Sequence, residues 1–590
     1  MKTPEDAYKL KLVSDPFVYG ETVYFTLNWI ESGEYRSSIY RFNGKEATRI
    51  TFGGHEKNPK IHNGGLYFVS YNKEEESLFV QEELAEPRKL FTNKSISKYI
   101  FHRDGVLAIT VDKSEKDKPF VTSSVKYRFD TTGFLRERKK LVSVLEEPPR
   151  VLASGDFDVI DVSSNGQRAV FAAAVEDNDR GLEDVYELDV KGGKYRKVTS
   201  GEGKAGTVCV ASDGTIAYLG HRKGLKPWAS SSLIFPEAGK EVEVGRTSHN
   251  KVTTDLFVSA SESLVSDNGV LYLEGQEGGF VFLYSYDGTN VKKLTEPNRA
   301  VRAFHVAGGK VAYVYTSPEK PSVLSFNGEY DPNPNVIGHP LERIEVEGRE
   351  AWLILSSKGS PTVLNVHGGP QMAYGEAYSI EFNFLADNGF NVLFGNPRGS
   401  DGYGEEFAYR CVGDWGGEDF QDLMKFMDAA KSIYGLKEEF AITGGSYGGF
   451  MTNAAITQTT RFKCAVAERC VSNLMSMCGT SDIGFWFNAL ESGVKDPWSP
   501  EGMEQLLRMS PITRVKSART PTMFIHGEED YRCPIEQSEQ MYTALRLNGV
   551  DAVLARYPGD SHEHARRGIP KNMNDRLARK LEWFRKYMQQ

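Results

Sequence analysis

The chain has 590 residues, of which 40% are hydrophobic and 26% are charged. This composition is ordinary for a folded globular protein, and it excludes the disordered and fibrous classes. The formal net charge is −9, with −6 of it on residues 341–590, so neither half of the chain is basic. We therefore expect no nucleic acid and no anionic membrane as a partner.

The start of the chain, MKTPEDAYKLKLV, does not resemble a secretory signal. It lacks an apolar stretch of about 7 to 15 residues, and no run in the chain approaches the roughly 18 apolar residues of a membrane helix. Five of the six cysteines follow position 410, and no CxxC pair occurs. We expect a cytoplasmic protein with free buried thiols, no metal and no cofactor.

The first 330 residues repeat short β-rich runs separated by turns that contain Gly, Asn or Asp. Seven runs that each follow a turn signal are predicted as buried strands: Val23–Thr26, Leu66–Ser70, Val106–Thr110, Ala169–Ala173, Thr215–Leu219, Val270–Leu273 and Val311–Tyr315. Seven further runs alternate apolar and polar residues: Ile39–Phe42, Leu78–Gln81, Lys126–Phe129, Val185–Leu188, Leu233–Phe235, Phe282–Tyr286 and Val323–Phe326.

Successive runs of the first set begin 40 to 63 residues apart, close to the repeat of a four-stranded propeller blade. The sequence therefore predicts a seven-bladed β-propeller in residues 1–335, whose first residues could pack on the second domain. One blade more or fewer fits the same spacing. A pair of β-sandwiches is the competing interpretation.

The pattern of predicted elements changes after the Pro/Asn-rich segment Tyr330–Asn335, which is typical of a linker. Six apolar runs are then predicted as strands: Thr362–Val366, Asn391–Gly395, Phe440–Thr443, Cys464–Ala467, Thr522–His526 and Ala552–Arg556. Four segments between or after them are predicted as helices: Gly417–Ile433, Tyr447–Gln458, Pro534–Leu547 and Asn572–Met588. Such alternation predicts a doubly wound α/β domain in residues 336–590.

The motif Gly444-Gly-Ser446-Tyr-Gly448 lies between a predicted strand and a predicted helix. This is the setting of a nucleophile elbow, in which Ser446 projects from the edge of the sheet. The backbone N–H of Tyr447 would then face a developing oxyanion. A glycine-flanked serine between a strand and a helix therefore indicates that Ser446 acts as a nucleophile.

An activated serine needs a base and an acid that orients it, and α/β-hydrolases supply the acid first. Asp530 follows one predicted strand and His562 follows the next, in the required order. His564 is a rival base that spacing alone does not exclude. The loop that contains Gly369 follows the first strong strand and matches the type that donates a second N–H to the oxyanion.

Six segments together resemble the prolyl oligopeptidase family of serine peptidases, and among its branches the acylaminoacyl peptidases. They are His367–Pro370, Asn396–Gly404, Gly413–Gly417, Gly444–Gly449, His526–Asp530 and Ser561–His562. The resemblance covers nearly all of the C-terminal half, whereas the propeller half agrees in architecture alone. It implies a β-propeller that caps an α/β-hydrolase domain, with Ser446, Asp530 and His562 as the triad, and it favours His562 over His564.

Three side chains are candidates for substrate binding. Arg532 lies two residues past the predicted acid, and the resemblance implies that its guanidinium donates to a substrate carbonyl. The alternative is a surface arginine paired with Glu528 or Glu529. Phe485 and Trp486 belong to an aromatic run that could line a specificity pocket or a plain core.

The sequence therefore predicts a serine peptidase that cleaves short peptides near the N-terminus and releases N-acylated amino acids. A homo-oligomer is expected, because edge strands of such sheets often pair. A dipeptidyl peptidase or oligopeptidase, a carboxylesterase and a non-catalytic propeller scaffold are the alternatives.

Overall fold

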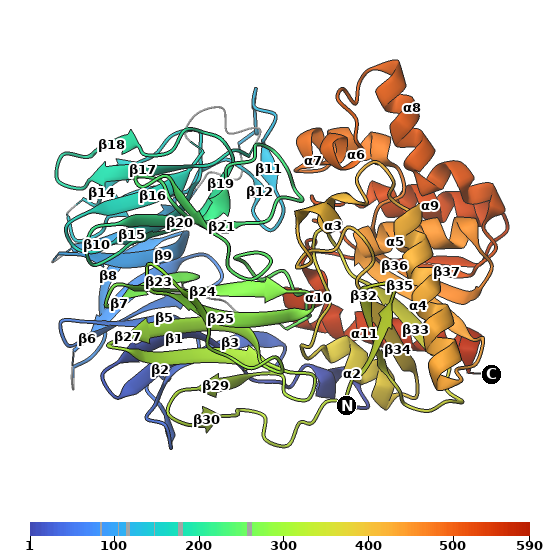
Figure 1. Cartoon of the computed structure of the whole chain (residues 1–590), viewed down its shortest axis with the longest axis horizontal. Helices are drawn as coiled ribbons and strands as arrows, with labels where there is room; N and C mark the ends of the chain where they lie inside the picture. Colours follow the sequence, from blue (N-terminus) through green and yellow to red (C-terminus); the bar gives the residue numbers. More distant parts are fainter. Residues whose placement is uncertain are drawn as a thin grey trace.

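The computed structural model describes residues 1–82, 85–103, 105–113, 118–146, 148–174, 181–256 and 262–589. Two parts lie side by side (Figure 1), a ring of small β-sheets from the N-terminal half and a helix-covered sheet from the C-terminal half. The chain begins beside the second part, because helix α1 (Pro4–Ala7) lies there.

Within the described residues the N-terminal half forms seven four-stranded sheets, each antiparallel, so the predicted seven-bladed propeller is confirmed. The first four blades contain β1 (Leu12–Tyr19), β2 (Thr22–Glu31), β3 (Glu34–Phe42), β4 (Ala47–Arg49); β5 (Glu56–His62), β6 (Gly65–Tyr71), β7 (Glu76–Gln81), β8 (Arg88–Asn93); β9 (Ser95–His102), β10 (Gly105–Val111), β13 (Lys140–Ser143), β14 (Arg150–Ala153); and β15 (Val159–Ser164), β16 (Ala169–Ala173), β17 (Asp184–Asp189), β18 (Lys194–Lys197). The last three contain β19 (Lys204–Val210), β20 (Ile216–His221), β21 (Ser232–Phe235), β22 (Lys240–Val242); β23 (Leu264–Asp267), β24 (Val270–Glu277), β25 (Phe280–Tyr286), β26 (Val291–Lys293); and β27 (Ala300–Ala307), β28 (Lys310–Thr316), β29 (Val323–Ser325), β30 (Glu329–Tyr330).

The ring closes by side-chain packing between the first and seventh blades. Val13 and Phe25 of the first blade share one buried cluster with Val314 and Leu324 of the seventh. The rings of Phe25 and Tyr330 lie 5.5 Å apart. Each of these two blades takes all four strands from one continuous stretch, so apolar burial rather than a shared strand joins the ends of the propeller.

The predicted strand Lys126–Phe129 is wrong as a blade strand. The third strand of that blade is β13, which pairs with β10, whereas residues 128–134 form a separate hairpin of β11 (Arg128–Phe129) and β12 (Gly133–Phe134). Leu141 of β13 is fully buried, while Phe129 and Phe134 are exposed by 37% and 46%. Alternation identified a strand here, but it could not tell which sheet buries the apolar side chains.

The C-terminal half contains one eight-stranded sheet in the order β31-β32-β34-β33-β35-β36-β37-β38. The strands are β31 (Glu342–Val346), β32 (Arg349–Ile354), β33 (Thr362–Val366), β34 (Asn391–Gly395), β35 (Phe440–Ser446), β36 (Phe462–Cys470), β37 (Thr522–Gly527) and β38 (Ala552–Tyr557). The six predicted strands are present and run parallel, whereas the antiparallel pair β31 and β32 was not predicted.

Helices cover both faces of this sheet. They are α2 (Ile380–Asp387), α3 (Glu405–Tyr409), α4 (Glu418–Tyr434), α5 (Tyr447–Gln458), α6 (Leu474–Thr480), α7 (Gly484–Glu491), α8 (Pro500–Met509), α9 (Glu536–Leu547), α10 (His564–Arg567) and α11 (Pro570–Met588), with a 3-10 helix at Pro511–Ser517. Leu364 and Ile442 pack with α4, α5 and α9, whereas their neighbours Val363 and Ala441 pack with α1, α2 and α11. Because successive strand residues face opposite sides, these clusters are the two faces of an α/β sandwich.

The two parts are joined between β30 and β31, which end at Tyr330 and begin at Glu342. We propose a domain boundary near residue 335, between these strands. The residues before β1 pack on the α/β domain, since Ala7, Tyr8 and Leu10 lie in the buried cluster of α2 and α11. In the described part of the chain, no helix has both the length and the apolar character needed to cross a membrane.

Candidate active site

The turn around Ser446 has the geometry expected of a nucleophile elbow. Strand β35 ends at Ser446, and helix α5 begins at Tyr447. Ser446 has φ 63° and ψ −122°, and such a conformation costs a non-glycine residue about 1 to 3 kcal/mol. A Cβ on Gly444 or Gly448 would lie 2.6 Å or 2.1 Å from the carbonyl oxygen of Val366, so only glycine lets the turn approach β33 this closely.

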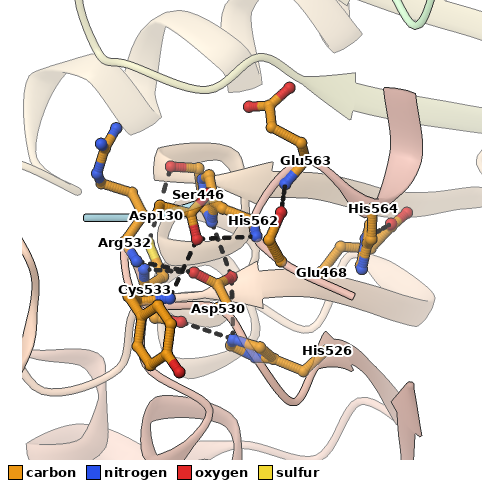
Figure 2. A network of polar contacts seen from close by, with 12 residues as sticks. Asp130, Ser446, Glu468, His526, Asp530, Arg532, Cys533, His562, Glu563 and His564 are labelled. Carbon is orange, nitrogen blue, oxygen red and sulfur yellow. Dashed lines mark hydrogen bonds and ion pairs between the residues drawn. The ribbon is translucent and has the colours of Figure 1, made fainter. Parts of the chain in front are cut away.

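Asp530 and His562 follow β37 and β38 and contact each other (Figure 2). His562 Nδ1 lies 2.8 Å from Asp530 Oδ2, and Asp530 Oδ1 accepts hydrogen bonds from the backbone N–H groups of Arg532 (3.0 Å) and Cys533 (2.8 Å). Burial opposes ionisation of Asp530, but the charge of His562 and hydrogen bonds from His526 and His562 outweigh it and hold the pKa of Asp530 well below its usual value. Asp530 is therefore an anion able to orient the imidazole.

Ser446 and His562 line the same cavity. In this conformation Ser446 Oγ lies 3.8 Å from the sulfur of Cys533. Hydrogen bonds between a nucleophile and its base are often long until substrate binds, so the rotamer does not exclude the pairing. Burial raises the pKa of the Cys533 thiol well above its usual value, and a neutral thiol does not compete as a nucleophile.

His564, the rival base, points away from this cavity. Its Nε2 lies 3.2 Å from Glu468 Oε2, and the residue is 2% exposed. Arg576 and Lys580 pair with the same Glu468. Burial lowers the pKa of His564 to about 4, so this imidazole is neutral near pH 7. Its placement favours His562 as the base.

The loop after β33 lies against the nucleophile. A Cβ on Gly368 would be 3.5 Å from Ser446 Cβ, and Gly369 lines the cavity. Within the described residues the Gly369 N–H donates no hydrogen bond, and the Tyr447 N–H lies in the first turn of α5, where N–H groups lack helical partners. The hydroxyl of Tyr447 points elsewhere and donates a buried hydrogen bond to Asp419. Both predicted oxyanion donors can therefore still donate.

The cavity has a volume of about 820 Å³ and lies between the propeller and the α/β domain. Phe485 and Trp486 of α7 line it, as does Arg532. Phe487, the next aromatic residue, also reaches the core, where its ring lies 6.3 Å from that of Trp415. Of the two readings of the aromatic run, the placement favours a pocket wall for Phe485 and Trp486.

Arg532 forms an ion pair, but with neither of the two partners weighed from the sequence. Its Nε and Nη2 donate to Asp482 at 2.7 Å and 3.1 Å, whereas Glu528 pairs with Arg556. The guanidinium also lies 5.2 Å above the ring of Phe129. Its Nη1 donates no hydrogen bond to a described residue, so one end of the fork remains available to substrate.

Sequence reasoning missed Asp130, which lies in the turn between β11 and β12 of the propeller. Its Oδ1 accepts the backbone N–H groups of Tyr531 (3.1 Å) and His562 (3.2 Å), one from each loop of the predicted acid and base (Figure 2). Its own N–H donates to Asp482 at 2.8 Å. These contacts join residues more than 350 positions apart in the sequence, so no local motif predicts them.

Two family models match the chain. Residues 26–321 match the N-terminal β-propeller domain of acylaminoacyl-peptidase, and residues 376–590 match the prolyl oligopeptidase family. The chain is 43% identical over 232 residues to the uncharacterized peptidase YuxL of Bacillus subtilis (strain 168), covering 39% of this chain and 35% of that protein. It is 32% identical over 256 residues to the acylamino-acid-releasing enzyme of Arabidopsis thaliana, covering 42% and 33%. The chain thus spans about a third of the length of these curated relatives.

A solved structure is similar over almost the whole chain. The acylaminoacyl peptidase of Pyrococcus horikoshii superposes with a TM-score of 0.86 at 24% identity, covering 99% of this chain and 97% of that one. The likeness shows that the two proteins share a fold.

Proposed function

Since this chain belongs to the prolyl oligopeptidase family of serine peptidases, we propose that it hydrolyses short peptides near their N-terminus and releases N-acylated amino acids. The observation that carries the proposal is the 2.8 Å contact of His562 Nδ1 with Asp530 Oδ2, beside a cavity that Ser446 also lines. Family membership and this geometry support the same reaction class, acyl transfer to a serine.

In the proposed reaction His562 takes the proton of Ser446 Oγ, and the oxygen attacks the scissile carbonyl. The N–H groups of Gly369 and Tyr447 donate to the resulting oxyanion. His562 then protonates the leaving amine, which leaves an ester of Ser446, and water hydrolyses that ester with His562 again as base. The anionic Asp530 stabilises the imidazolium that forms in each half of the reaction.

The propeller supports a preference for short substrates. The cavity wall includes Phe129 and Lys139 from the propeller as well as Ser446 from the α/β domain, so a substrate must fit between the two parts. A folded protein cannot enter a space of about 820 Å³. A similar solved protein, described as an acylaminoacyl peptidase, has been seen with a peptide chloromethyl ketone.

The charges of the cavity support a blocked N-terminus. A free ammonium would need unpaired carboxylates, but four acids of the wall are already paired with cations, and the fifth that the structure describes, Glu137, is exposed. The pairs are Asp158 with Arg138, Glu183 with Lys204, Asp482 with Arg532, and Glu563 with Arg566. A neutral N-acyl group needs only a donor, and Arg532, whose Nη1 donates to no described residue, lines the same cavity.

A substrate panel tests the proposal. The kcat/KM of an N-acetyl-phenylalanine anilide should exceed that of a free-amine dipeptide anilide and fall to background in Ser446→Ala. A higher value for the free-amine substrate would indicate a dipeptidyl peptidase, a class found among the relatives. Activity on a nitrophenyl ester alone would indicate an esterase. Activity that survives in Ser446→Ala would refute the nucleophile.

We also propose a homo-oligomer in the cytoplasm. The sheet ends in edge strands β31 and β38, which can pair with a second copy. All six cysteines are buried and free, as suits a reducing compartment. Light scattering after size exclusion tests the first proposal, and fractionation of cells tests the second.

A further inference from the structure

Arg469 lies beside the predicted nucleophile, in the same cavity as Ser446 and His562. It occupies the second-to-last position of β36 with a φ of 36°, a left-handed backbone that disfavours side chains and is typical of functional sites. A Cβ on Gly445 would lie 2.6 to 2.7 Å from three guanidinium atoms of Arg469. The guanidinium therefore packs against the residue that precedes Ser446.

This guanidinium has no partner among the described residues. No hydrogen bond or ion pair joins Arg469 to another described side chain or carbonyl, and its Nε is buried. The cavity's other two guanidinium groups are held, Arg532 by Asp482 and Arg566 by Glu563. A guanidinium carries five N–H donors in a planar fork that matches a carboxylate. Arg469 thus presents an unneutralised cation next to the reacting serine.

The order of the strands places Arg469 on the leaving-group side of Ser446. The loop that carries Gly369, one of the two predicted oxyanion donors, follows β33 on one side of β35, whereas β36, β37 and β38 lie on the other side. The last two carry Asp530 and His562. Because His562 must protonate the leaving amine, that amine lies toward β36 and Arg469.

We propose that Arg469 binds the C-terminal carboxylate of a short leaving peptide, which makes the enzyme select substrates whose chain ends one or two residues past the cleaved bond. The inference rests on the proposed function, since a peptide with a blocked N-terminus and neutral side chains carries only this one charge. Consecutive residues are about 3.8 Å apart, so a carboxylate at that distance along the chain can reach a guanidinium packed on Gly445.

The neighbouring charges leave this cation available. Glu563 and Arg566 follow His562 in the same wall and neutralise each other, with Nε and Oε2 2.7 Å apart. Burial opposes ionisation of Glu563, but Arg566 and Arg469 outweigh it and hold its pKa below the usual value. The three residues together carry one net positive charge, which favours an anion.

The test compares N-acetyl-phenylalanyl-alanine with its C-terminal amide, using the intact enzyme and product analysis by chromatography. The wild-type enzyme should prefer the free acid. Arg469→Gln should lower kcat/KM for the acid by about 10- to 150-fold, mainly through KM, and leave the amide nearly unchanged. Arg469→Lys should keep part of the preference, and Lys139→Gln, which removes another cation of the wall, should keep the acid-to-amide ratio.

Several outcomes would overturn the inference. A wild-type enzyme that cleaves acid and amide equally has no carboxylate site. Equal losses on acid, amide and a nitrophenyl ester in Arg469→Gln would assign Arg469 to support of the elbow. If Arg469→Gln lowers kcat/KM only for a substrate with aspartate before the cleaved bond, Arg469 binds an anion of the acyl part of the substrate and not the carboxylate of the leaving peptide.

A second measurement does not require peptidase activity. Free alanyl-alanine should inhibit hydrolysis of the nitrophenyl ester more strongly than its amide, and Arg469→Gln should abolish the difference. Failure of the proposed function can be distinguished from failure of this inference. An enzyme that cleaves only peptides with a free amine lacks the proposed N-acyl specificity. The ratio of kcat/KM for the acid and the amide forms of those peptides still tests the role of Arg469. Thermal unfolding of each variant verifies that it folds.

Discussion

The contact between the propeller and the two loops of the predicted acid and base makes Asp130→Ala the most informative substitution. Asp130 is 4% exposed, and its carboxylate is the acceptor for the N–H groups of Tyr531 and His562. Alanine removes the acceptor and leaves both donors without a partner. The loops must then shift to find water, which moves His562 away from the position that serves Ser446.

The size of the effect follows from those two donors. A buried donor left without an acceptor costs about 1 to 3 kcal/mol, and the low end applies where water can enter from a neighbouring cavity. Restoring both loops for the reaction therefore costs about 2 to 3 kcal/mol, or roughly 30- to 150-fold in kcat/KM. The loss should be equal for an N-acetyl anilide and a small ester, because both need His562 and because alanine keeps the backbone N–H of residue 130 that donates to Asp482, the partner of Arg532. A mere wall of the pocket would affect only the KM of the larger substrate.

The assay measures kcat/KM on both substrates and the rate of covalent labelling by an organophosphonate. Asp130→Asn keeps a carbonyl oxygen at the same place and should retain most of the activity. Asp156→Ala, which removes an exposed propeller acid paired with Arg138, serves as the control. If Asp130→Ala labels within threefold of wild type, the hairpin does not position His562. If Asn is as damaging as Ala, the charge rather than the acceptor matters.

Three further predictions follow from the site. His562→Ala should lower kcat by several orders of magnitude and His564→Ala only mildly, as steady-state kinetics would show, and the reverse ranking would exchange their roles. Burial holds the pKa of His564 at about 4, below the usual 6.5. As the pH falls from about 6.5 to 4, His564 is therefore protonated in the unfolded chain but not in the folded one, and the free energy of unfolding decreases. Urea unfolding should therefore show that His564→Gln loses less stability over this window than wild type does, and parallel losses would contradict the assignment. Arg532→Ala should lower kcat/KM for an N-acetyl anilide by about 10- to 150-fold and for a nitrophenyl ester less, whereas equal losses would make Arg532 a support of the acid loop.

The sequence predicted the elements whose signal is local. A blade strand such as Ala169–Ala173 is an apolar run bounded by turns, and the elbow at Ser446 is a glycine motif between a strand and a helix. Asp530 and His562 could be found because each follows a strand end, and parallel strands bring such ends to one edge of the sheet. Periodicity and order therefore predicted both domains and the serine and acid of the candidate triad, whereas the choice of His562 over His564 came from the family resemblance.

The parts that could not be predicted depend on which sheet or loop a segment meets. Lys126–Phe129 alternates as a strand should, but its end lies against the α/β domain, where the guanidinium of Arg532 is 5.2 Å from the centre of the Phe129 ring. Arg469 belongs to no recognisable motif, because its proposed role depends on the packing of its guanidinium against Gly445 of the neighbouring strand. Neither property can be read from residues next to each other in the sequence.

Asp482 shows why the two halves must act together. Its carboxylate is fully buried and accepts three N–H groups, two from the guanidinium of Arg532 and one from the backbone of Asp130. A buried carboxylate is tolerated only while such partners hold it, so a displacement of the hairpin weakens the hold on Arg532 as well. Asp130 also binds the backbone of His562. One turn of the propeller therefore contacts the loop of the predicted base and, through Asp482, the arginine proposed to recognise the acyl group.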